Sequence, residues 1–306
     1  MAYIDKIKSG NKTFYYLGKT LRLKSGKWKK IRIRLGTKNP SKETIAKKLK
    51  ELKLEQYKIY NKDFIDANKL EVIDDSREVY QNHVKTLPKT ITEKEESDFV
   101  IRFTYNSNAI EGNRLTLRDT YLIINEKQIP SGAPPKDYNE ALNGREAFDF
   151  LKRDKGKLTI EFIEKLNGIL TKNTGVVYSG RIRFFPIKIS GADFIPPNEK
   201  DVPKLLKEMI DFYYKNKNKF HPFVMACLIH VKFVEIHPFE DGNGRTGRAL
   251  MNWVLMKAEY PKLFVPVKNR QQYYEAIDLH NAGKYKEYCT KMFEIMLDQI
   301  HLSTNK

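Results

Sequence analysis

His237-Pro-Phe-Glu-Asp-Gly-Asn-Gly-Arg-Thr-Gly-Arg248 is the stretch that decides the fold, because it joins two helical patterns through a turn that is dense in charge. Residues 223–236, just before it, are mostly apolar and contain neither Gly nor Pro, which is typical of a buried helix. Residues 249–258, just after it, resume a helical pattern with one apolar face. The sequence therefore predicts two helices joined by a polar turn.

The turn has the features of an anion-binding site. Gly242 and Gly244 permit a tight turn and leave main-chain N–H groups uncovered, so an anion can approach the backbone. Arg245 and Arg248 are three residues apart and share one face of the first turn of the new helix. The positive end of a helix dipole together with two guanidinium groups predicts a phosphate site.

Two further side chains in the same stretch predict chemistry on that phosphate. A neutral imidazole at His237 can take the proton from an incoming hydroxyl. The carboxylate of Asp241 is a hard oxygen ligand suited to Mg²⁺. A polar turn without a ligand is the alternative, but cations beside a positive helix end cost stability unless an anion is expected. The full pattern favours a site.

The stretch resembles the signature of the Fic family, H-P-F-x-[D/E]-G-N-G-R-x-x-R, at every defined position. This resemblance implies transfer of a nucleoside monophosphate, usually AMP from ATP, to a hydroxyl of a target protein, with release of pyrophosphate. It implies His237 as the general base and Asp241 as the Mg²⁺ ligand. The anion hole would be formed by Gly242, Asn243 and Gly244, and the β- and γ-phosphates would be held by Arg245 and Arg248.

A second motif lies far upstream. Ser107-Asn-Ala-Ile-Glu111-Gly112-Asn113 ends a predicted helix, where the dipole disfavours an acidic residue. By itself this glutamate would be read as solvent-exposed. The segment resembles the Fic inhibitory motif, [S/T]-x-x-x-E-[G/N], and the resemblance implies that Glu111 pairs with Arg248 at the γ-phosphate position. Ser107 would tie the helix to its surroundings.

Two more segments resemble parts of the family. Residues 175–197 predict a β-hairpin with a turn near residues 190–192, similar to the Fic flap, which aligns the target by strand addition. Arg181 and Arg183 within it would either face the phosphates or lie on the surface. Tyr273 and Asn281 match the nucleoside-binding segment of the family; without the resemblance they would be read as core and helix cap.

A zinc site on His221, His230 and His237 is disfavoured, because spacings of nine and seven residues do not recur on one helix turn.

The charge is unevenly distributed. The chain has a formal net charge of +18, yet residues 1–60 hold 18 Lys/Arg against 4 Asp/Glu, or +14, which leaves +4 for the remainder. Residues 2–37 predict a small antiparallel sheet and residues 42–60 a helix that covers one side of it. Lys30, Arg32 and Arg34 would form a row on the other side. Such a row with nearby aromatics fits nucleic acid, and a solvated lysine-rich surface is the equal alternative.

The chain is thus predicted to be mainly α, with a Fic-type helical core, a hairpin flap and a small sheet-and-helix module. The module spans residues 1–61, and residues 62–306 form a helical linker and Fic domain. Two cysteines, no signal peptide and no apolar span predict a cytoplasmic protein without a membrane segment.

The predicted function is a self-inhibited protein adenylyltransferase (AMPylator) that uses ATP and Mg²⁺ on a Ser, Thr or Tyr of a target protein, with removal of AMP as the reverse reaction. The alternatives are a nucleic-acid-binding regulator whose Fic core senses nucleotide, and a toxin-like Fic enzyme. The sequence leaves the oligomeric state open.

Overall fold

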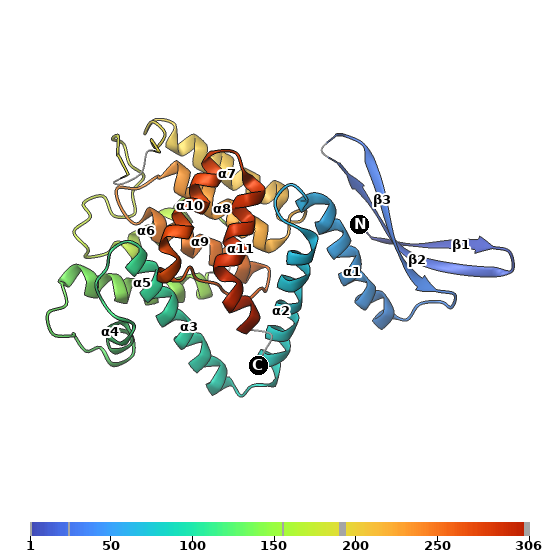
Figure 1. Cartoon of the computed structure of the whole chain (residues 1–306), viewed down its shortest axis with the longest axis horizontal. Coiled ribbons are helices and arrows are strands. Elements are labelled where there is room, and N and C mark those ends of the chain that lie inside the picture. Colours follow the sequence, from blue (N-terminus) through green and yellow to red (C-terminus); the bar gives the residue numbers. More distant parts are fainter. Residues whose placement is uncertain (1, 24, 155, 190–193, 303–306) are drawn as a thin grey trace.

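The computed structural model describes residues 2–23, 25–154, 156–189 and 194–302. A three-stranded sheet at the N-terminal end projects from a body of helices (Figure 1). The helices of the described chain are α1 Lys42–Asn61, α2 Ala67–Thr86, α3 Lys89–Ile110, α4 Leu117–Tyr121, α5 Pro135–Arg153, α6 Ile160–Leu170, α7 Val202–Asn216, α8 Pro222–Ile236, α9 Asn243–Lys257, α10 Arg270–Asn281 and α11 Tyr285–Leu302. A π-helical turn, η1 Leu122–Glu126, continues α4, and a short 3-10 helix, η2 Val267–Asn269, precedes α10. The mainly helical prediction is confirmed.

The sheet is a meander of β1 Tyr3–Ser9, β2 Lys12–Arg22 and β3 Trp28–Gly36, in the order β1-β2-β3 with antiparallel neighbours. Helix α1 packs on one face and buries Leu17, Leu21 and Leu52. The side chain of Ser41 caps α1 by accepting a hydrogen bond from the Thr44 N–H at 3.1 Å. The sheet and helix predicted from residues 2–60 are therefore confirmed, with one sheet face left uncovered by α1.

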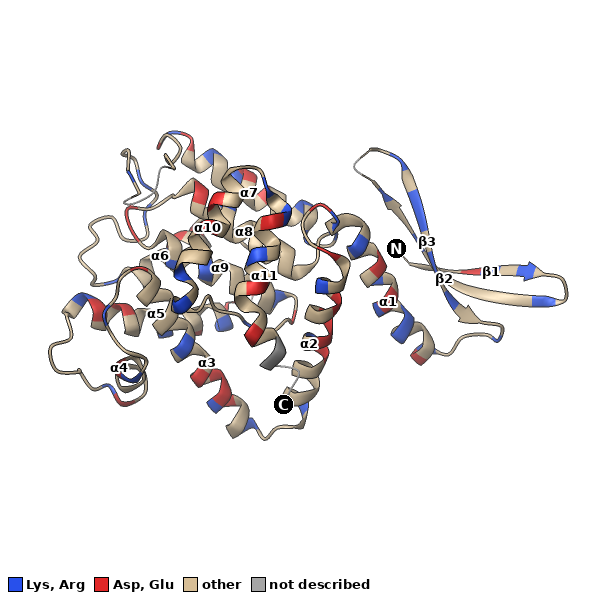
Figure 2. Cartoon of the chain, in the orientation of Figure 1, with Lys and Arg blue, Asp and Glu red and all other residues tan. Residues whose placement is uncertain are grey.

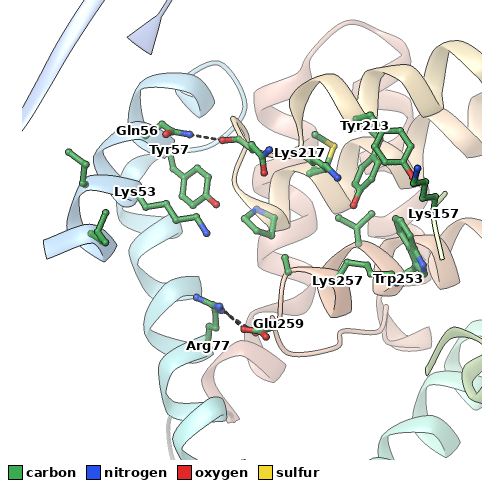
Figure 3. A pocket seen from close by; sticks show the side chains of 18 of the residues that line it. Lys53, Gln56, Tyr57, Arg77, Lys157, Tyr213, Lys217, Trp253, Lys257 and Glu259 are labelled. Carbon is green, nitrogen blue, oxygen red and sulfur yellow. Dashed lines mark hydrogen bonds and ion pairs between the residues drawn. The ribbon is translucent and has the colours of Figure 1, made fainter. Parts of the chain in front are cut away.

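The C-terminal end of α1 is fastened to the helical body. Gln56 donates to the carbonyl of Asn218 at 2.7 Å, and the buried Asn61 accepts from the N–H of His221 at 3.1 Å. Next to these contacts lies a groove of about 920 Å³ between α1 and the helical body, lined mainly by residues of α1, α7 and the C-terminal half of α9 (Figure 3). This groove lies at the opposite end of α9 from Arg245.

Helices α8 and α9 form the centre of the body. Nearly all of α8 is buried, from Pro222 to Ile236, as expected for a helix that is apolar on every side. It packs against α7, α9 and α11, while α9 also contacts α3, α5 and α6 (Figure 1). The turn between α8 and α9 is thus held by elements distant in sequence. Within the described chain, no helix combines the length and apolarity needed to cross a membrane.

The predicted flap differs from a hairpin. Residues 181–189 and 194–198 contain no paired strand, and the turn expected near residues 190–192 lies outside the described residues. Pro186, Pro196 and Pro197 cannot donate to a strand ladder. The buried side chain of Arg183 joins the two arms instead, donating to the carbonyls of Phe185 at 3.2 Å and Pro197 at 2.6 Å.

Candidate active site

The turn after α8 has a fixed backbone. His237 ends the helix in the left-handed conformation, with φ 48° and ψ 59°, and Gly242 opens α9 with φ 78°. A Cβ on Gly242 would lie 2.6 Å from Cγ2 of Thr171, so only glycine fits. The Asn243 side chain braces the loop, accepting from the Phe239 N–H at 2.9 Å and donating to the Phe239 carbonyl at 2.8 Å.

His237 is poised as a base. Its Nδ1 lies 3.1 Å from the carbonyl oxygen of Val234. A carbonyl only accepts, so Nδ1 donates the hydrogen and the lone pair is left on Nε2. Burial lowers the pKa of His237, against smaller opposing effects from the Val234 hydrogen bond and the Glu111 charge. The imidazole is therefore neutral at neutral pH and can accept a proton.

Arg248 lies at the centre of a hydrogen-bond network and is 1% exposed. Its Nε donates to Oγ of Ser107 at 3.0 Å, and its Nη2 donates to the Ser107 carbonyl at 2.7 Å. Nη2 also donates to Oε1 of Glu111 at 2.7 Å, and Nη1 to the Tyr273 hydroxyl at 3.3 Å. The contact expected between Glu111 and Arg248 is present, and Ser107, expected to tie its helix to the surroundings, bonds the same guanidinium.

The Glu111 carboxylate lies against the start of α9. A Cβ on Gly244 would be 2.1 Å from Oε1 of Glu111. The first N–H groups of a helix have no partner within the helix, and the dipole is positive there. The carboxylate thus occupies a position that suits the oxygen of an anionic ligand, and it comes from the C-cap of α3.

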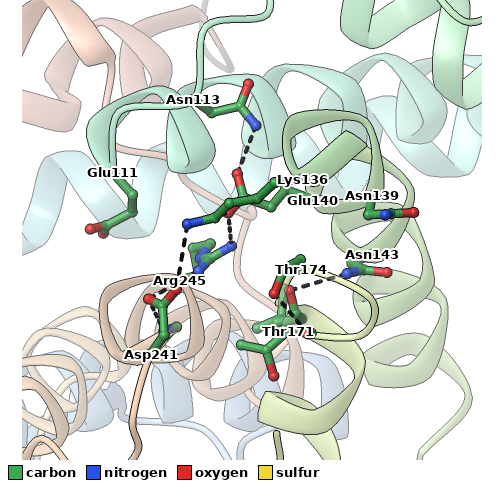
Figure 4. Close-up of polar contacts among 12 residues, drawn as sticks. Glu111, Asn113, Lys136, Asn139, Glu140, Asn143, Thr171, Thr174, Asp241 and Arg245 are labelled. Carbon is green, nitrogen blue, oxygen red and sulfur yellow. Dashed lines mark hydrogen bonds and ion pairs between the residues drawn. The ribbon is translucent and has the colours of Figure 1, made fainter. Parts of the chain in front are cut away.

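Arg245 is held by two carboxylates (Figure 4). Its guanidinium, 2% exposed, donates from Nη1 to Oε1 of Glu140 at 2.7 Å and lies 3.2 Å from Oδ1 of Asp241. Its Nε has no hydrogen-bond partner among the described residues. Glu140, which sequence reasoning missed, also accepts from Nδ2 of Asn113 at 2.7 Å. This links Arg245 to the segment just after Glu111.

Asp241 is the carboxylate that could meet a metal ion. Burial raises its pKa, but Arg245, the Gly242 N–H and Lys136 outweigh that effect and the pKa is lowered. Oδ2 of Asp241 lies 3.8 Å from the ammonium of Lys136, which is half exposed. The described residues hold no cluster of three or more metal-binding side chains. One accessible carboxylate fits Mg²⁺ that takes its remaining ligands from phosphates and water.

Comparison with known proteins identifies this arrangement. Residues 157–255 match the model of the Fic/DOC family. A protein adenylyltransferase Fic of Nematostella vectensis is 32% identical over 230 residues, which cover 73% of this chain and 53% of that protein. The chain contains a Fic/DOC domain. The match to the family model includes the whole stretch from His237 to Arg248, whereas Glu111 lies outside it.

Other relatives agree with this. The protein adenylyltransferase fic-1 of Caenorhabditis elegans is 28% identical over 73% of this chain and 44% of its own length. The chain spans about half the length of the curated relatives it matches. Two solved structures share the fold: Fic-1 of Caenorhabditis elegans has a TM-score of 0.70 and 24% identity over 86% of this chain and 76% of that one. A Fic-domain signalling protein of Bacteroides thetaiotaomicron has a TM-score of 0.69 and 23% identity, over 76% and 95%.

The Fic domain contains a further brace at Asn167, a fully buried residue of α6. Its Nδ2 donates to the carbonyl of Asp241 at 3.0 Å and to Oγ1 of Thr246 at 3.2 Å, and its Oδ1 accepts from the Gly180 N–H at 3.1 Å. The amide therefore fixes the loop that carries Asp241. Because both partners lie more than seventy residues away, no local pattern indicated this role.

Tyr273 and Asn281, the two residues matched to the nucleoside-binding segment, differ in burial. Tyr273 is 1% exposed, and its hydroxyl is 2.8 Å from Nε2 of His230, whose pKa burial lowers to about 3. With Arg248 on its other side, Tyr273 supports a guanidinium rather than offering a free ring face. Asn281 ends α10 and is exposed. Within the described part of the chain, its side chain makes no hydrogen bond to Arg248 or His237.

Arg181 and Arg183, the two arginines of the predicted flap, also differ in burial. Arg181 is exposed. Arg183 is 2% exposed and donates from Nε to the His237 carbonyl at 2.8 Å, while its N–H donates to the Pro238 carbonyl at 2.9 Å. Arg183 therefore anchors the flap to the catalytic loop and does not face the anion site.

Proposed function

We propose that the chain is a protein adenylyltransferase that moves AMP from ATP to a Ser, Thr or Tyr hydroxyl of a target protein. The observation that carries this proposal is the His237 imidazole, neutral and with its lone pair on Nε2, beside a helix start that holds two buried arginines. The names of the relatives, protein adenylyltransferase Fic, support the same activity.

In the proposed reaction the phosphates of ATP lie against the loop of Gly242, Asn243 and Gly244 and the first turn of α9. The target hydroxyl gives its proton to Nε2 of His237 while its oxygen bonds to the α-phosphorus. The bond from that phosphorus to the β-phosphate oxygen breaks, and pyrophosphate leaves. Arg245 and Arg248 would stabilise the charge on the β- and γ-phosphates.

A bound Mg²⁺ would neutralise charge on the leaving pyrophosphate. Asp241 is the residue that would hold the ion, because its Oδ2 is the accessible carboxylate oxygen of the loop. Lys136 would have to move aside or contact a phosphate itself, since its ammonium lies 3.8 Å from that oxygen.

We further propose that the enzyme is self-inhibited by Glu111. Its carboxylate takes one Nη2 hydrogen bond of Arg248 and lies against Gly244, two contacts that a γ-phosphate would otherwise make. ATP must displace the carboxylate or bind in a pose that misaligns the α-phosphorus. In a second, hydrolytic reaction Glu111 would orient a water that attacks the phosphorus of the attached AMP; the bond from that phosphorus to the side-chain oxygen breaks, the hydroxyl regains a proton, and AMP leaves.

The reaction is proposed to take place in the cytoplasm. Cys227 and Cys289 are both buried free thiols, which fits a reducing compartment. The preference for ATP and the identity of the hydroxyl-bearing target are parts of the same proposal.

The direct test incubates the pure protein with cell lysate and ATP that carries the label on the α-phosphate. A protein band is expected to become labelled with α-labelled ATP. No such transfer is expected from γ-labelled ATP, or from α-labelled ATP when a metal chelator is present. Label from γ-labelled ATP would mean phosphate transfer, and equal labelling with the chelator would exclude the role proposed for Asp241.

A second candidate function concerns residues 1–61. We propose that this module binds nucleic acid, because it holds 18 of the 56 Lys/Arg residues of the chain and a net charge of +14. Salt-dependent binding of labelled nucleic acid by the full chain supports this function, and no binding at low salt removes it.

A further inference from the structure

The sheet face turned away from α1, here called the outer face, carries a row of cations. Lys30, Arg32 and Arg34 alternate along β3 with Ile31 and Ile33, which are partly buried toward α1. Figure 2 shows the basic residues of β3 along a strand that projects from the helical body. Lys30 lies opposite Thr20 of β2 and Arg32 opposite Gly18, and the ring of Tyr3 from β1 extends over Gly18.

Three cations of the outer face are stacked on aromatic rings of the same face. The Lys30 ammonium lies 5.0 Å from the centroid of Tyr3, and the Arg34 guanidinium 4.8 Å from that of Phe14. Arg22 lies 5.9 Å from Trp28. Such pairs restrict the long side chains, so less conformational entropy is lost when an anion binds them.

Negative charge on this face is scarce. Among the described residues, Asp5 is its single carboxylate, with oxygen–nitrogen distances of 2.8 Å to Lys30 and 2.9 Å to Arg32. Within the same part of the chain, neither Arg22 nor Arg34 has a carboxylate partner. Four cations and one carboxylate leave an excess of three positive charges on a face that α1 does not cover.

We propose that the outer face binds double-stranded DNA, with the β2–β3 ribbon in the major groove. This rests on the proposed nucleic-acid binding of residues 1–61 and adds the face and the form of the ligand. The ribbon carries all four cations, and a two-stranded ribbon is an element that the major groove admits. Guanidinium groups can then bond phosphates or the O6 and N7 edge of guanine.

The aromatic contacts favour a duplex over a single strand. Proteins that bind single strands stack unpaired bases on free aromatic faces. On this sheet one side of each of three rings, Tyr3, Phe14 and Trp28, is already covered by a cation. Trp28 is still 67% exposed, but the charged heads of all three pairs lie on the same face, and they suit the regular phosphates and groove edges of a duplex.

The length of the row agrees with a short duplex contact. Alternate residues of a strand are roughly 6.7 Å apart, so Lys30 and Arg34 are separated by about 13 Å. Along one DNA strand the charges recur every ~3.4 Å of helix axis, so the row spans about four base pairs. Lys12, at the β1–β2 turn and two residues before Phe14 on the same face of β2, would reach a phosphate beyond them.

The experiment measures fluorescence anisotropy of labelled DNA with the full chain at several salt concentrations. The probes are a duplex of mixed sequence, about twenty base pairs long, and the matching single-stranded DNA and RNA. The test variant carries Arg32→Ala and Arg34→Ala. The matched control carries Lys42→Ala and Lys47→Ala, which remove the same charge from the exposed side of α1 in the same module.

The duplex is expected to bind at least about tenfold more tightly than the single strands at low salt. The Arg32→Ala/Arg34→Ala variant should lose at least about tenfold in duplex affinity, and the log–log salt slope should fall by roughly 1.8 if both residues contact phosphates. The control should change the affinity by less than about threefold. Unchanged circular dichroism spectra exclude misfolding, and an Arg34→Ala single variant, which leaves the Asp5 contacts intact, should show an intermediate loss.

Every other outcome overturns a specific part of the proposal. Equal losses of duplex affinity in the test and control variants would mean that only net charge matters. The assignment of binding to the outer face would then be wrong, while nucleic-acid binding by the module would stand. Tighter binding of either single strand overturns the duplex. No binding of any probe at low salt removes both this inference and the proposed nucleic-acid binding, without bearing on AMP transfer.

Discussion

Arginines at the start of α9 and arginines on the sheet are prepared for anions in opposite ways. Arg245 and Arg248 are 2% and 1% exposed, and each has a carboxylate within 2.7 Å. Arg32 and Arg34 lie on an exposed strand face, and only Arg32 of the two has a carboxylate partner among the described residues. The first pair is buried and positioned before the ligand arrives, and the second pair is exposed to solvent, with Arg32 against Asp5 and Arg34 against the Phe14 ring.

This difference predicts two kinds of recognition. A buried guanidinium costs several kcal/mol in desolvation unless it is paired, so the active site must carry carboxylates that hold its place until phosphate binds. The sheet cations need no such partner because water solvates them, and their attraction for an anion depends on salt. The active site should therefore respond to single substitutions with large effects, and the sheet with small additive ones.

The largest effect is expected from His237→Ala, which should lower AMP transfer by about 10²–10⁴-fold while nucleotide binding stays intact, because the side chain moves a proton. Burial lowers the pKa of His237, so the neutral base persists to a lower pH than for an ordinary histidine. The rate of the wild type should thus stay level from neutral pH down past about 6.5 and fall only below that. A rate profile that falls already near pH 7, or a variant within tenfold of the wild type, would contradict the base role.

The next effect concerns the buried pair of Glu140 and Arg245. Glu140→Gln removes one charge from a pair in which both side chains are at most 5% exposed, and should lower the free energy of unfolding by about 3 kcal/mol. Glu146→Gln, which breaks a half-exposed pair with Lys172 at 3.5 Å, should change it by less than about 1 kcal/mol. Chemical denaturation measures both. Equal shifts would mean that burial does not distinguish the two regions.

A smaller but still clear effect is expected at Glu111. Its charge-assisted bond to Arg248 contributes about 1.5–3 kcal/mol, or about 10- to 150-fold in the population of the productive ATP pose. Glu111→Gly should raise AMP transfer, including onto the enzyme itself, by at least about tenfold. Adding Arg248→Ala should cancel the gain, and Glu111→Gln, which keeps the shape but not the charge, should fall between. Rates for wild type and Glu111→Gly within twofold of each other would exclude this carboxylate as the brake.

The sequence indicated the active-site loop because its residues lie within twelve positions, where spacing alone fixes which side chains share a turn. The contact of Glu111 with Arg248 spans 137 residues and was predicted only through a motif. Glu140 was missed, although a signal exists: it lies on the buried face of α5 with Asn143, Gly144 and Ala147. A carboxylate on such a face requires a cation from another element.

Other residues could not be assigned from local pattern. Asn167 and Arg183 act on backbone atoms of the 237–241 loop, more than fifty residues away, and nothing in their own segments indicates it. The predicted hairpin was wrong for the described arms of residues 181–198 because alternation of apolar residues does not account for the prolines that interrupt a ladder. Tyr273 was matched to a nucleoside-binding position. In the structure its hydroxyl is held by hydrogen bonds with His230 of α8 and Arg248 of α9, which its own segment does not indicate.

The smallest effect is expected at Asp5, and it separates the two regions most directly. Asp5 stands to Lys30 and Arg32 as Glu111 stands to Arg248, but on an exposed face, where water and salt screen an ion pair. The hydrogen bond from Lys30 has the largest effect on the pKa of Asp5 and lowers it. Burial opposes this effect, and the hydrogen bond from Arg32 lowers the pKa further. The carboxylate is therefore charged at neutral pH and down past about 3.9, and loses its charge only below that.

If Asp5 only offsets positive charge, Asp5→Asn should tighten binding of duplex DNA by about two- to fivefold at neutral pH, because one repulsive charge is removed and two cations are released. The log–log salt slope should become steeper by up to about 0.9 for each additional phosphate contact. Titration of the same labelled duplex measures both quantities. A weaker complex would mean that Asp5 holds Lys30 and Arg32 in their binding geometry, and the sheet would then be preorganised by a carboxylate in the same way as the active site.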